Sequence, residues 1–401
     1  MERILRRTYL EQLLEWKDKQ IVKVVTGVRR CGKSTLMEMM QEELMQQGIQ
    51  KSQIVTVNFE DYDFIELRDS KRLYEYIKEK LSTDRMSYVF LDEVQHVDNY
   101  SDVIDALYIN KHVDIYVTGS NAYLLSSEIA TYLSGRYVEI KMLPLSFEEF
   151  LSAKGDRQEL GRRYSEYITE SSFPYSLELS GNSRALIEYL NGIYNTVVLK
   201  DVMQRKRISD AMMLESVIRF IADNIGNTLS TKRIADTMTS AGRKIDVKTV
   251  EKYLSALRES FVLYKTSRYD VKGRQLLRTQ EKYYLVDVAL RRILLGTKAT
   301  DVGHILENVV YLELLRRNQE VFIGKVGEKE IDFVTTDITG GVFYYQVAAT
   351  ARSQETLERE LEPLRELKDH YPKYLLTLDD DPEMDFDGIR KVNVLQWLLQ
   401  G

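Results

Sequence analysis

Several features that would place this chain in a special class are scarce or missing. It has one cysteine, Cys31, so no internal disulfide can form, which fits a reducing cytoplasm. No apolar run approaches the roughly 20 residues that cross a bilayer, and the first residues lack the apolar segment of a secretory signal. A positive net charge is also missing, because the formal charge is −6. We therefore expect a cytoplasmic protein with no membrane partner, whose binding to nucleic acid would need a local basic patch.

The most informative stretch runs from Gly27 to Thr35. Its sequence, Gly-Val-Arg-Arg-Cys-Gly-Lys-Ser-Thr, fits the phosphate-binding pattern G-x-x-x-x-G-K-[ST]. A short β-branched run, Ile21 to Thr26, precedes it, and helix formers with apolar residues at helical spacing follow it. In such a strand–loop–helix unit the glycines turn backbone N–H groups toward a phosphate, and the helix N-terminus favours negative charge.

Two side chains of this loop have predicted roles toward ATP. Lys33 would reach the β- and γ-phosphates, and the Ser34 hydroxyl would ligate Mg²⁺. Cys31 has two interpretations, a thiol whose pKa is lowered by Lys33 and the helix N-terminus, or a small loop residue without a special role. The other predicted nucleotide-binding positions of the loop are Gly27, Arg30, Gly32 and Thr35.

An α/β domain is predicted over residues 1–152, which is consistent with a chain too long for one core. Strands alternate with helical stretches, which favours a mostly parallel sheet with its ligand at the carboxyl ends of the strands. After the first strand, the predicted strands are 53–59, 87–93, 114–121 and 137–140.

Polar residues end two of these strands. Asp92 would hold Mg²⁺, and Glu93 would orient and polarise an attacking water. Ser120 and Asn121 would either contact the γ-phosphate or water, or simply form a turn. Arg136, in Leu-Ser-Gly-Arg-Tyr, is either an arginine that a neighbouring subunit inserts to neutralise the transferring phosphoryl group, or an ordinary surface arginine.

These motifs, with Val-Asn-Phe-Glu-Asp, Phe-Leu-Asp-Glu-Val-Gln, Val-Thr-Gly-Ser-Asn and the run from Leu-Ser-Gly-Arg-Tyr to Phe-Glu-Glu-Phe, resemble the AAA-type ATPases of bacteria and archaea. The chain is most similar to the branch with a C-terminal domain of unknown function and nuclease-like fold. This resemblance covers nearly the whole chain. It implies ATP hydrolysis by a ring-forming homo-oligomer, with roles for Lys33, Ser34, Asp92, Glu93, Ser120 or Asn121, and Arg136.

Two further domains are predicted in the middle of the chain. Residues 153–210 form helical segments broken by glycine and by Ser-Ser-Phe-Pro, as in a small helical lid or connector. Residues 211–290 contain three helical stretches followed by two strand-like runs, 262–265 and 282–286. This order is typical of a winged helix-turn-helix.

The predicted winged helix carries a local basic excess. Residues 243–282 contain eleven Lys or Arg and five Asp or Glu, so 11 − 5 gives +6. Such an excess suits a phosphate backbone, although winged helices also bind protein partners. The candidate DNA contacts are Lys248, Lys252, Arg268, Lys272 and Arg274.

Residues 300–401 are again α/β, and their element order resembles the PD-(D/E)xK nuclease fold. By this resemblance Glu307, Asp332 and Gln346 take the metal positions. The catalytic lysine position is Ala348 here, with Lys325 or Lys329 as the only nearby replacements, so we expect a vestigial site that cleaves poorly.

Three functions are compatible with these patterns. The first is an oligomeric ATPase that couples hydrolysis to DNA binding or remodelling. A slow nucleotide-gated switch that binds a protein partner is the second. The third, an ATP-dependent metal nuclease, is the least favoured because the lysine and one carboxylate of its site are missing.

Overall fold

The computed structural model describes residues 3–122, 135–155, 157–203, 207–273, 275–296, 302–317 and 319–400. They form two compact units. The N-terminal unit is built from Arg3–Pro144 with Glu259–Phe261, and the C-terminal unit from Leu145–Arg258 with Val262–Gly401. Among the described residues, no helix combines the length and apolarity that a membrane span requires.

The N-terminal unit contains a five-stranded sheet of order β2-β3-β4-β1-β5, in which every neighbouring pair is parallel. All five predicted strands are confirmed, and the β-branched runs that predicted them form its buried centre. The strands are β1 (Val22–Thr26), β2 (Ile54–Asn58), β3 (Ser87–Asp92), β4 (Val113–Gly119) and β5 (Tyr137–Lys141).

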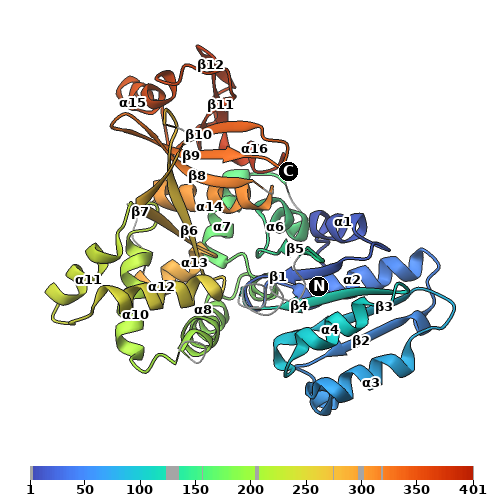
Figure 1. Ribbon diagram of the computed structural model, residues 1–401. Coiled ribbons are helices and arrows are strands. Elements are labelled where there is room, and N and C mark those ends of the chain that lie inside the picture. Colours follow the sequence, from blue (N-terminus) through green and yellow to red (C-terminus); the bar gives the residue numbers. More distant parts are fainter. Residues whose placement is uncertain are drawn as a thin grey trace. The chain divides into compact units, whose positions relative to one another are not determined.

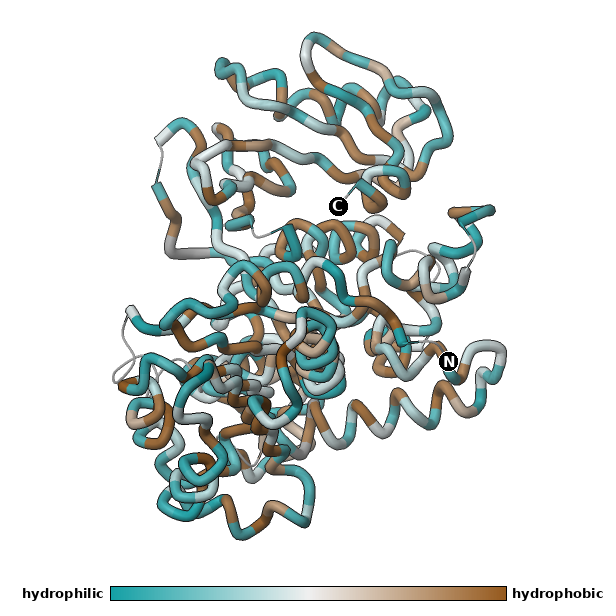
Figure 2. Tube along the Cα trace, turned by 90° about the vertical axis from the view of Figure 1, so that its right-hand side faces the viewer, coloured by the Kyte–Doolittle hydropathy of each residue, from teal (hydrophilic) through white to brown (hydrophobic). Residues whose placement is uncertain are grey.

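Helices cover both faces of this sheet (Figure 1). Val24 packs in one cluster with Leu73 and Ile104, whereas the next residue, Val25, is equally buried but points to the other face. Figure 2 shows that apolar and polar residues alternate along the helices, as expected for helices that pack one face against a core. The helices are α1 (Arg7–Glu15), α2 (Lys33–Gln46), α3 (Ser70–Lys80) and α4 (Tyr100–Tyr108), with α1 against α2 and α3 against α4.

The C-terminal unit begins with helices whose ends the sequence defines well. Ser230 Oγ accepts a hydrogen bond from Arg233 N at 3.1 Å, and Asp246 Oδ1 accepts one from Thr249 N at 2.7 Å, as expected for N-caps. The helices up to the first strand are α6 (Phe147–Lys154), α7 (Leu160–Glu170), α8 (Ser183–Ile193), α10 (Ala211–Asp223), α11 (Thr231–Ser240) and α12 (Val247–Glu259).

An eight-stranded sheet of order β12-β13-β11-β10-β9-β8-β6-β7 forms the rest of this unit. Its strands are β6 (Leu263–Asp270), β7 (Gln275–Leu285), β8 (Glu320–Val326), β9 (Lys329–Thr336), β10 (Val342–Ala348), β11 (Lys373–Thr377), β12 (Met384–Phe386) and β13 (Ile389–Asn393). The accompanying helices are α13 (Val288–Leu295), α14 (Val302–Arg316), α15 (Gln354–Arg365) and α16 (Val394–Trp397).

The predicted wing is part of this sheet. The β6–β7 hairpin is antiparallel, and β6 also pairs in parallel with β8, where Arg268 lies opposite Ile323 (Figure 1). Strands from the predicted domains 211–290 and 300–401 therefore share one sheet. The division into residues 1–152, 153–210, 211–290 and 300–401 stays a prediction.

The end of the chain is more ordered than its acidic composition suggests. The acidic run Asp379-Asp380-Asp381 predicts a turn in a solvated loop, and this prediction is wrong for Asp379, which is buried. Its carboxylate is buried, lies 3.0 Å from Lys391 Nζ and accepts a 2.6 Å hydrogen bond from Thr350 Oγ1. An internal ion pair thus compensates a charge that composition alone assigns to solvent.

Candidate nucleotide site

The loop between β1 and α2 has the backbone that the glycine pattern predicts. At Gly27, φ is +155° and an added Cβ would lie 2.2 Å from the Met142 carbonyl oxygen, so only glycine fits. Gly32 has φ +105° and is the N-cap of α2. Lys33 and Ser34 therefore lie in the first turn of this helix, next to the N–H groups that would face a phosphate. Arg30 is exposed on the same loop.

Lys33 is buried and forms an ion pair with a carboxylate. Its Nζ lies 3.1 Å from Glu93 Oε1 and donates to the Gly27 carbonyl oxygen at 3.2 Å. Burial disfavours the ammonium, but the nearby carboxylate of Glu93 outweighs it and raises the pKa of Lys33. The loop therefore carries a fixed positive charge at neutral pH.

Asp92 and Ser34, the two predicted magnesium ligands, are brought together. Burial raises the pKa of Asp92, against the effect of hydrogen bonds from Ser34 and Thr118. Thr118 donates its hydroxyl to Asp92 Oδ1 from the neighbouring strand. One carboxylate and one hydroxyl are the oxygen donors that Mg²⁺ prefers, with phosphates and water completing its shell. The residues present thus fit this cation.

Glu93 has a strained backbone and a fixed side chain. Its φ is +56°, in the left-handed region, and its N–H donates to Thr118 Oγ1 at 2.8 Å. Its Oε2 accepts hydrogen bonds from Ser120 Oγ at 2.8 Å and from Gln95 Nε2. Burial alone would raise the pKa of Glu93, but Lys33 and these donors lower it to about 2. The carboxylate is therefore charged and oriented.

The other predicted site residues differ in position. Ser120 joins the site through its bond to Glu93, whereas Asn121 follows it, half-buried, with its role still a prediction. Arg136 lies before β5, and its carbonyl oxygen accepts from Val22 N at the start of β1. Arg136 therefore lies beside the first residue of β1, whereas the phosphate loop begins at Gly27, after the last residue of β1. The two lie at opposite edges of the sheet within one subunit. Its guanidinium bonds Asp105 Oδ1 at 3.0 Å.

The Cys31 thiol does not have the lowered pKa that one interpretation gave it. Its side chain is completely buried, and this burial raises its pKa above the ordinary value, against the effect of Lys33. The Cys31 carbonyl oxygen accepts a 2.8 Å hydrogen bond from the buried Arg6. Cys31 is therefore a small buried residue of the loop.

Two residues of the site, Thr118 and Gln95, were not predicted from the sequence. Thr118 lies inside a predicted strand, and only the pairing of β3 with β4 brings it to Asp92. Gln95 follows Glu93 by two positions in Phe-Leu-Asp-Glu-Val-Gln, and this closeness was the one available signal.

The parallel sheet, the phosphate loop and the Asp-Glu pair at the end of β3 define a P-loop ATPase domain of the AAA type. The family model described as an AAA domain matches residues 19–151, and a domain of unknown function (DUF8612) matches residues 161–301. The chain belongs to the same family as an uncharacterized protein of Haemophilus influenzae, to which it is 40% identical over 401 residues, 99% of both chains.

Two other relatives extend this comparison. An uncharacterized protein of Methanocaldococcus jannaschii is 30% identical over 331 residues, covering 78% of this chain and 71% of its own length. A Walker-type ATPase of Pyrococcus abyssi matches with a TM-score of 0.52 and 15% identity, over 73% of this chain and 96% of that one. The second likeness supports the fold alone.

The predicted nuclease-like site is built around a lysine from another segment of the chain, Lys282. Lys282 of β7 is 4% exposed, and its Nζ lies 2.9 Å from Glu307 Oε1, 2.8 Å from Glu330 Oε1 and 3.7 Å from Asp332 Oδ1. Tyr284 also donates to Glu307 Oε1, at 2.6 Å. The ammonium thus lies among the carboxylates that were expected to hold a metal ion.

Two other residues considered for that site, Gln346 and Lys329, also form hydrogen bonds or ion pairs. Gln346 accepts from Asp332 N at 3.3 Å and donates to Glu360 Oε2 at 2.9 Å. Lys329 pairs with Glu362 and Glu366, at 2.6 and 2.7 Å, and not with the cluster. Within the described ranges, no group of three or more His, Cys, Asp or Glu side chains is placed to hold a metal ion.

The pKa values of two groups in this cluster are strongly shifted. Burial and the neighbouring Glu307 raise the pKa of Asp332 to about 8, although Lys282 opposes this. The Lys282 ammonium is favoured by its three carboxylate neighbours, which raise its pKa despite burial. A buried cation supplied by the chain therefore balances the carboxylates.

Two of the candidate DNA contacts are lysines on the surface of α12. Lys248 and Lys252 are exposed and lie four residues apart, hence on one face of the helix. The Arg268 guanidinium donates a hydrogen bond to the Gln280 side chain. Lys272 Nζ lies 3.5 Å from Glu366 Oε2, and this carboxylate partly neutralises its charge. Arg274 lies outside the described residues.

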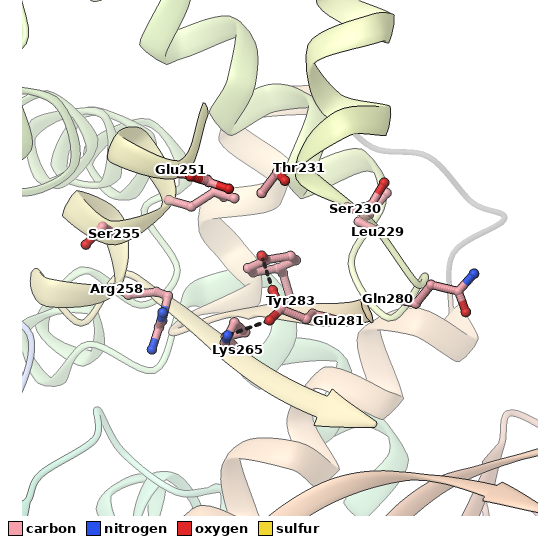
Figure 3. A pocket seen from close by; sticks show the side chains of 11 residues that line it. Leu229, Ser230, Thr231, Glu251, Ser255, Arg258, Lys265, Gln280, Glu281 and Tyr283 are labelled. Atoms are coloured by element: carbon pink, nitrogen blue, oxygen red, sulfur yellow. Dashed lines mark hydrogen bonds and ion pairs between the residues drawn. The ribbon is translucent and has the colours of Figure 1, made fainter. Parts of the chain in front are cut away.

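A cavity of about 360 Å³ lies beside another face of α12 (Figure 3). In its wall, Lys265 of β6 pairs with Glu281 of β7 at 2.5 Å, and the Tyr283 hydroxyl donates to Glu281 at 2.8 Å. Because acidic and basic side chains both line this cavity, it adds little positive potential to the lysine face. Its lining from α12 is Glu251, Leu254, Ser255 and Arg258.

Proposed function

We propose that this protein hydrolyses ATP at the loop between β1 and α2. One observation carries the proposal: the buried side chains of Lys33, Asp92 and Glu93 meet beside Ser34, and both carboxylates accept hydrogen bonds from hydroxyl groups. Lys33 would bind the β- and γ-phosphates. Ser34 and Asp92 would hold Mg²⁺, which when bound neutralises charge on those phosphates.

Glu93 would act on the attacking water. The water oxygen would form a bond to the γ-phosphorus as one of its O–H bonds breaks, and the Glu93 carboxylate would accept that proton and pass it on to the released phosphate or to solvent. The bond from this phosphorus to the bridging oxygen breaks, and ADP leaves with its electron pair. Lys33 Nζ lies 3.1 Å from Glu93 Oε1, so a phosphate that draws the lysine to itself would leave this oxygen for water.

We further propose that the active form is a ring-forming homo-oligomer in which Arg136 completes the site of a neighbouring subunit. Two features support this role. Arg136 is about half exposed, and it lies at the edge of the sheet away from its own phosphate loop. An arginine added in trans would stabilise the charge of the transferring phosphoryl group.

Mixing two inactive variants tests this arrangement. Arg136→Ala should lower turnover by about 1,000-fold, and Glu93→Gln should be similarly inactive. A mixed ring contains interfaces with one intact Glu93 and one intact Arg136, so the equimolar mixture should recover about a quarter of wild-type turnover. The control is Asp105→Ala, which removes the carboxylate partner of Arg136 but leaves the arginine in place. This variant should stay active. A mixture as inactive as its components would reject the trans role.

For the output of hydrolysis we propose DNA binding through the exposed face of α12, with low sequence specificity. The local basic excess supports this, although Lys282 is buried and must be subtracted from the surface charge. The alternative is a slow switch whose winged helix binds a protein partner. A nuclease role is not favoured, because Lys282 already lies among the carboxylates that would hold metal.

Replacing Lys248 and Lys252 by alanine should weaken binding to duplex DNA of any sequence. If each contacts one phosphate, the slope of log affinity against log salt should become shallower by about 2. The matched control is the double variant Lys71→Ala with Lys78→Ala, which removes two lysines from α3 of the N-terminal unit. ATP turnover should be measured with and without DNA at several salt concentrations. Unchanged affinity in the double variant, or no DNA stimulation of the wild type, would favour the protein-binding switch.

A further inference from the structure

Gln95 is a side chain of the nucleotide site to which no role has been given so far. It lies in a short 3-10 turn, Val94–His96, directly after Glu93. Its Nε2 donates to Glu93 Oε2 and also lies 3.3 Å from Ser120 Oγ. One amide group thus connects the carboxylate at the end of β3 with the hydroxyl at the end of β4.

The orientation of this amide follows from chemistry. A carboxylate oxygen only accepts hydrogen bonds, so the group that faces Glu93 Oε2 must be the NH₂ and not the carbonyl. The Gln95 carbonyl oxygen consequently points elsewhere. It is buried and has no hydrogen-bond partner among the described residues. A buried acceptor without a donor costs free energy, so the orientation of the amide toward Glu93 is maintained at that cost.

The contacts of Glu93 show what the amide controls. Oε2 accepts hydrogen bonds from Gln95 and Ser120, whereas Oε1 faces Lys33 Nζ at 3.1 Å. When Lys33 turns to a phosphate, the donors on Oε2 are what still fix the plane of the carboxylate. Oε1 then becomes the oxygen that can accept from water.

We propose that Gln95 is a positioning residue for hydrolysis. Its amide and the Ser120 hydroxyl together hold Glu93 Oε2. With the plane of the carboxylate fixed in this way, Glu93 Oε1 is directed at the attacking water, whose oxygen then faces the γ-phosphorus as in-line attack requires. The inference rests on ATP hydrolysis at this loop.

Gln95→Leu tests the role, because leucine fills a similar volume but neither donates nor accepts. We expect kcat to fall by about 10- to 100-fold, while KM for ATP and the affinity for a fluorescent nucleotide stay within about twofold. The thermal midpoint should not fall, since the variant also removes an unpaired buried acceptor. Gln95→Glu should lose as much kcat, because a carboxylate replaces the donor to Glu93.

Gln53→Leu is the matched control. Gln53 is also a buried glutamine of the N-terminal unit, but its amide donates to the Met86 carbonyl oxygen at 2.8 Å, at the start of β2. This control should lower the thermal midpoint and leave kcat nearly unchanged.

Three outcomes would overturn the assignment. Wild-type kcat in Gln95→Leu would show that the amide does not position Glu93. Equal losses in kcat, nucleotide affinity and thermal midpoint would show a purely structural role. A wild-type protein that binds ATP but never hydrolyses it, even with DNA present, would reject the proposed function itself and the role of Gln95 with it.

Discussion

Glu93→Gln should bind ATP at least as tightly as the wild type and hydrolyse it at least about 100-fold more slowly. Glutamine keeps the shape and the contact with Ser120, but it cannot polarise a water as a carboxylate does. The Lys33 ammonium also loses its partner at 3.1 Å. Without this internal competitor, Lys33 is more available to phosphates, so the affinity for ATP should rise or stay the same.

Nucleotide binding and phosphate release have to be measured separately to check this result. Equilibrium titration with a fluorescent ATP analogue gives the affinity, and a phosphate-release assay gives the turnover. Lys33→Ala serves as the contrast, because it removes the cation that would hold the β- and γ-phosphates and should abolish binding. Turnover at the wild-type rate in Glu93→Gln would show that Glu93 does not activate the water.

Lys282→Met should destabilise the C-terminal unit by about 3–5 kcal/mol. Methionine matches the length of the lysine stem but leaves Glu307 buried with no cation beside it. The variant that also carries Glu307→Gln should recover part of the loss, since it removes the uncompensated charge while keeping an acceptor for Tyr284. The two changes are therefore expected to be strongly non-additive.

Denaturant titration followed by tryptophan fluorescence can measure this loss in the correct unit. The chain has only Trp16 and Trp397, and Trp397 is buried in the C-terminal unit. A Trp16→Phe background therefore makes the signal specific. In the wild type, Mn²⁺ should leave the unfolding midpoint unchanged, because Lys282 already balances the carboxylates. A clear stabilisation of the wild type by Mn²⁺ would mean that the cluster binds metal after all.

The nucleotide site could be predicted because its chemistry is local in the sequence. The phosphate loop needs glycines at fixed spacing, and Gly27 and Gly32 have the positive φ values that explain them. Asp92 and Glu93 end an apolar strand that a parallel sheet brings to the same edge as the loop. Spacing and strand order were sufficient for these residues.

The parts that could not be predicted depend on pairings between distant segments. Lys282 precedes Glu307 by 25 positions, and it meets the cluster only because the hairpin joins the sheet of the C-terminal strands. Thr118 reaches Asp92 across the register of β3 and β4. Asp379 was assigned to solvent because its buried partner, Lys391, lies on a strand that the sequence did not suggest.

The parallel pairing of β6 with β8 has a consequence for how this protein can be divided. A fragment that stopped near residue 290 would keep the β6–β7 hairpin but lose β8, and so would expose backbone N–H and C=O groups along β6. Such an open edge recruits strands from other molecules, so both halves of a cut made there would tend to aggregate. The smallest fragment suited to isolated DNA-binding or folding work therefore spans Leu145 to the C-terminal strands.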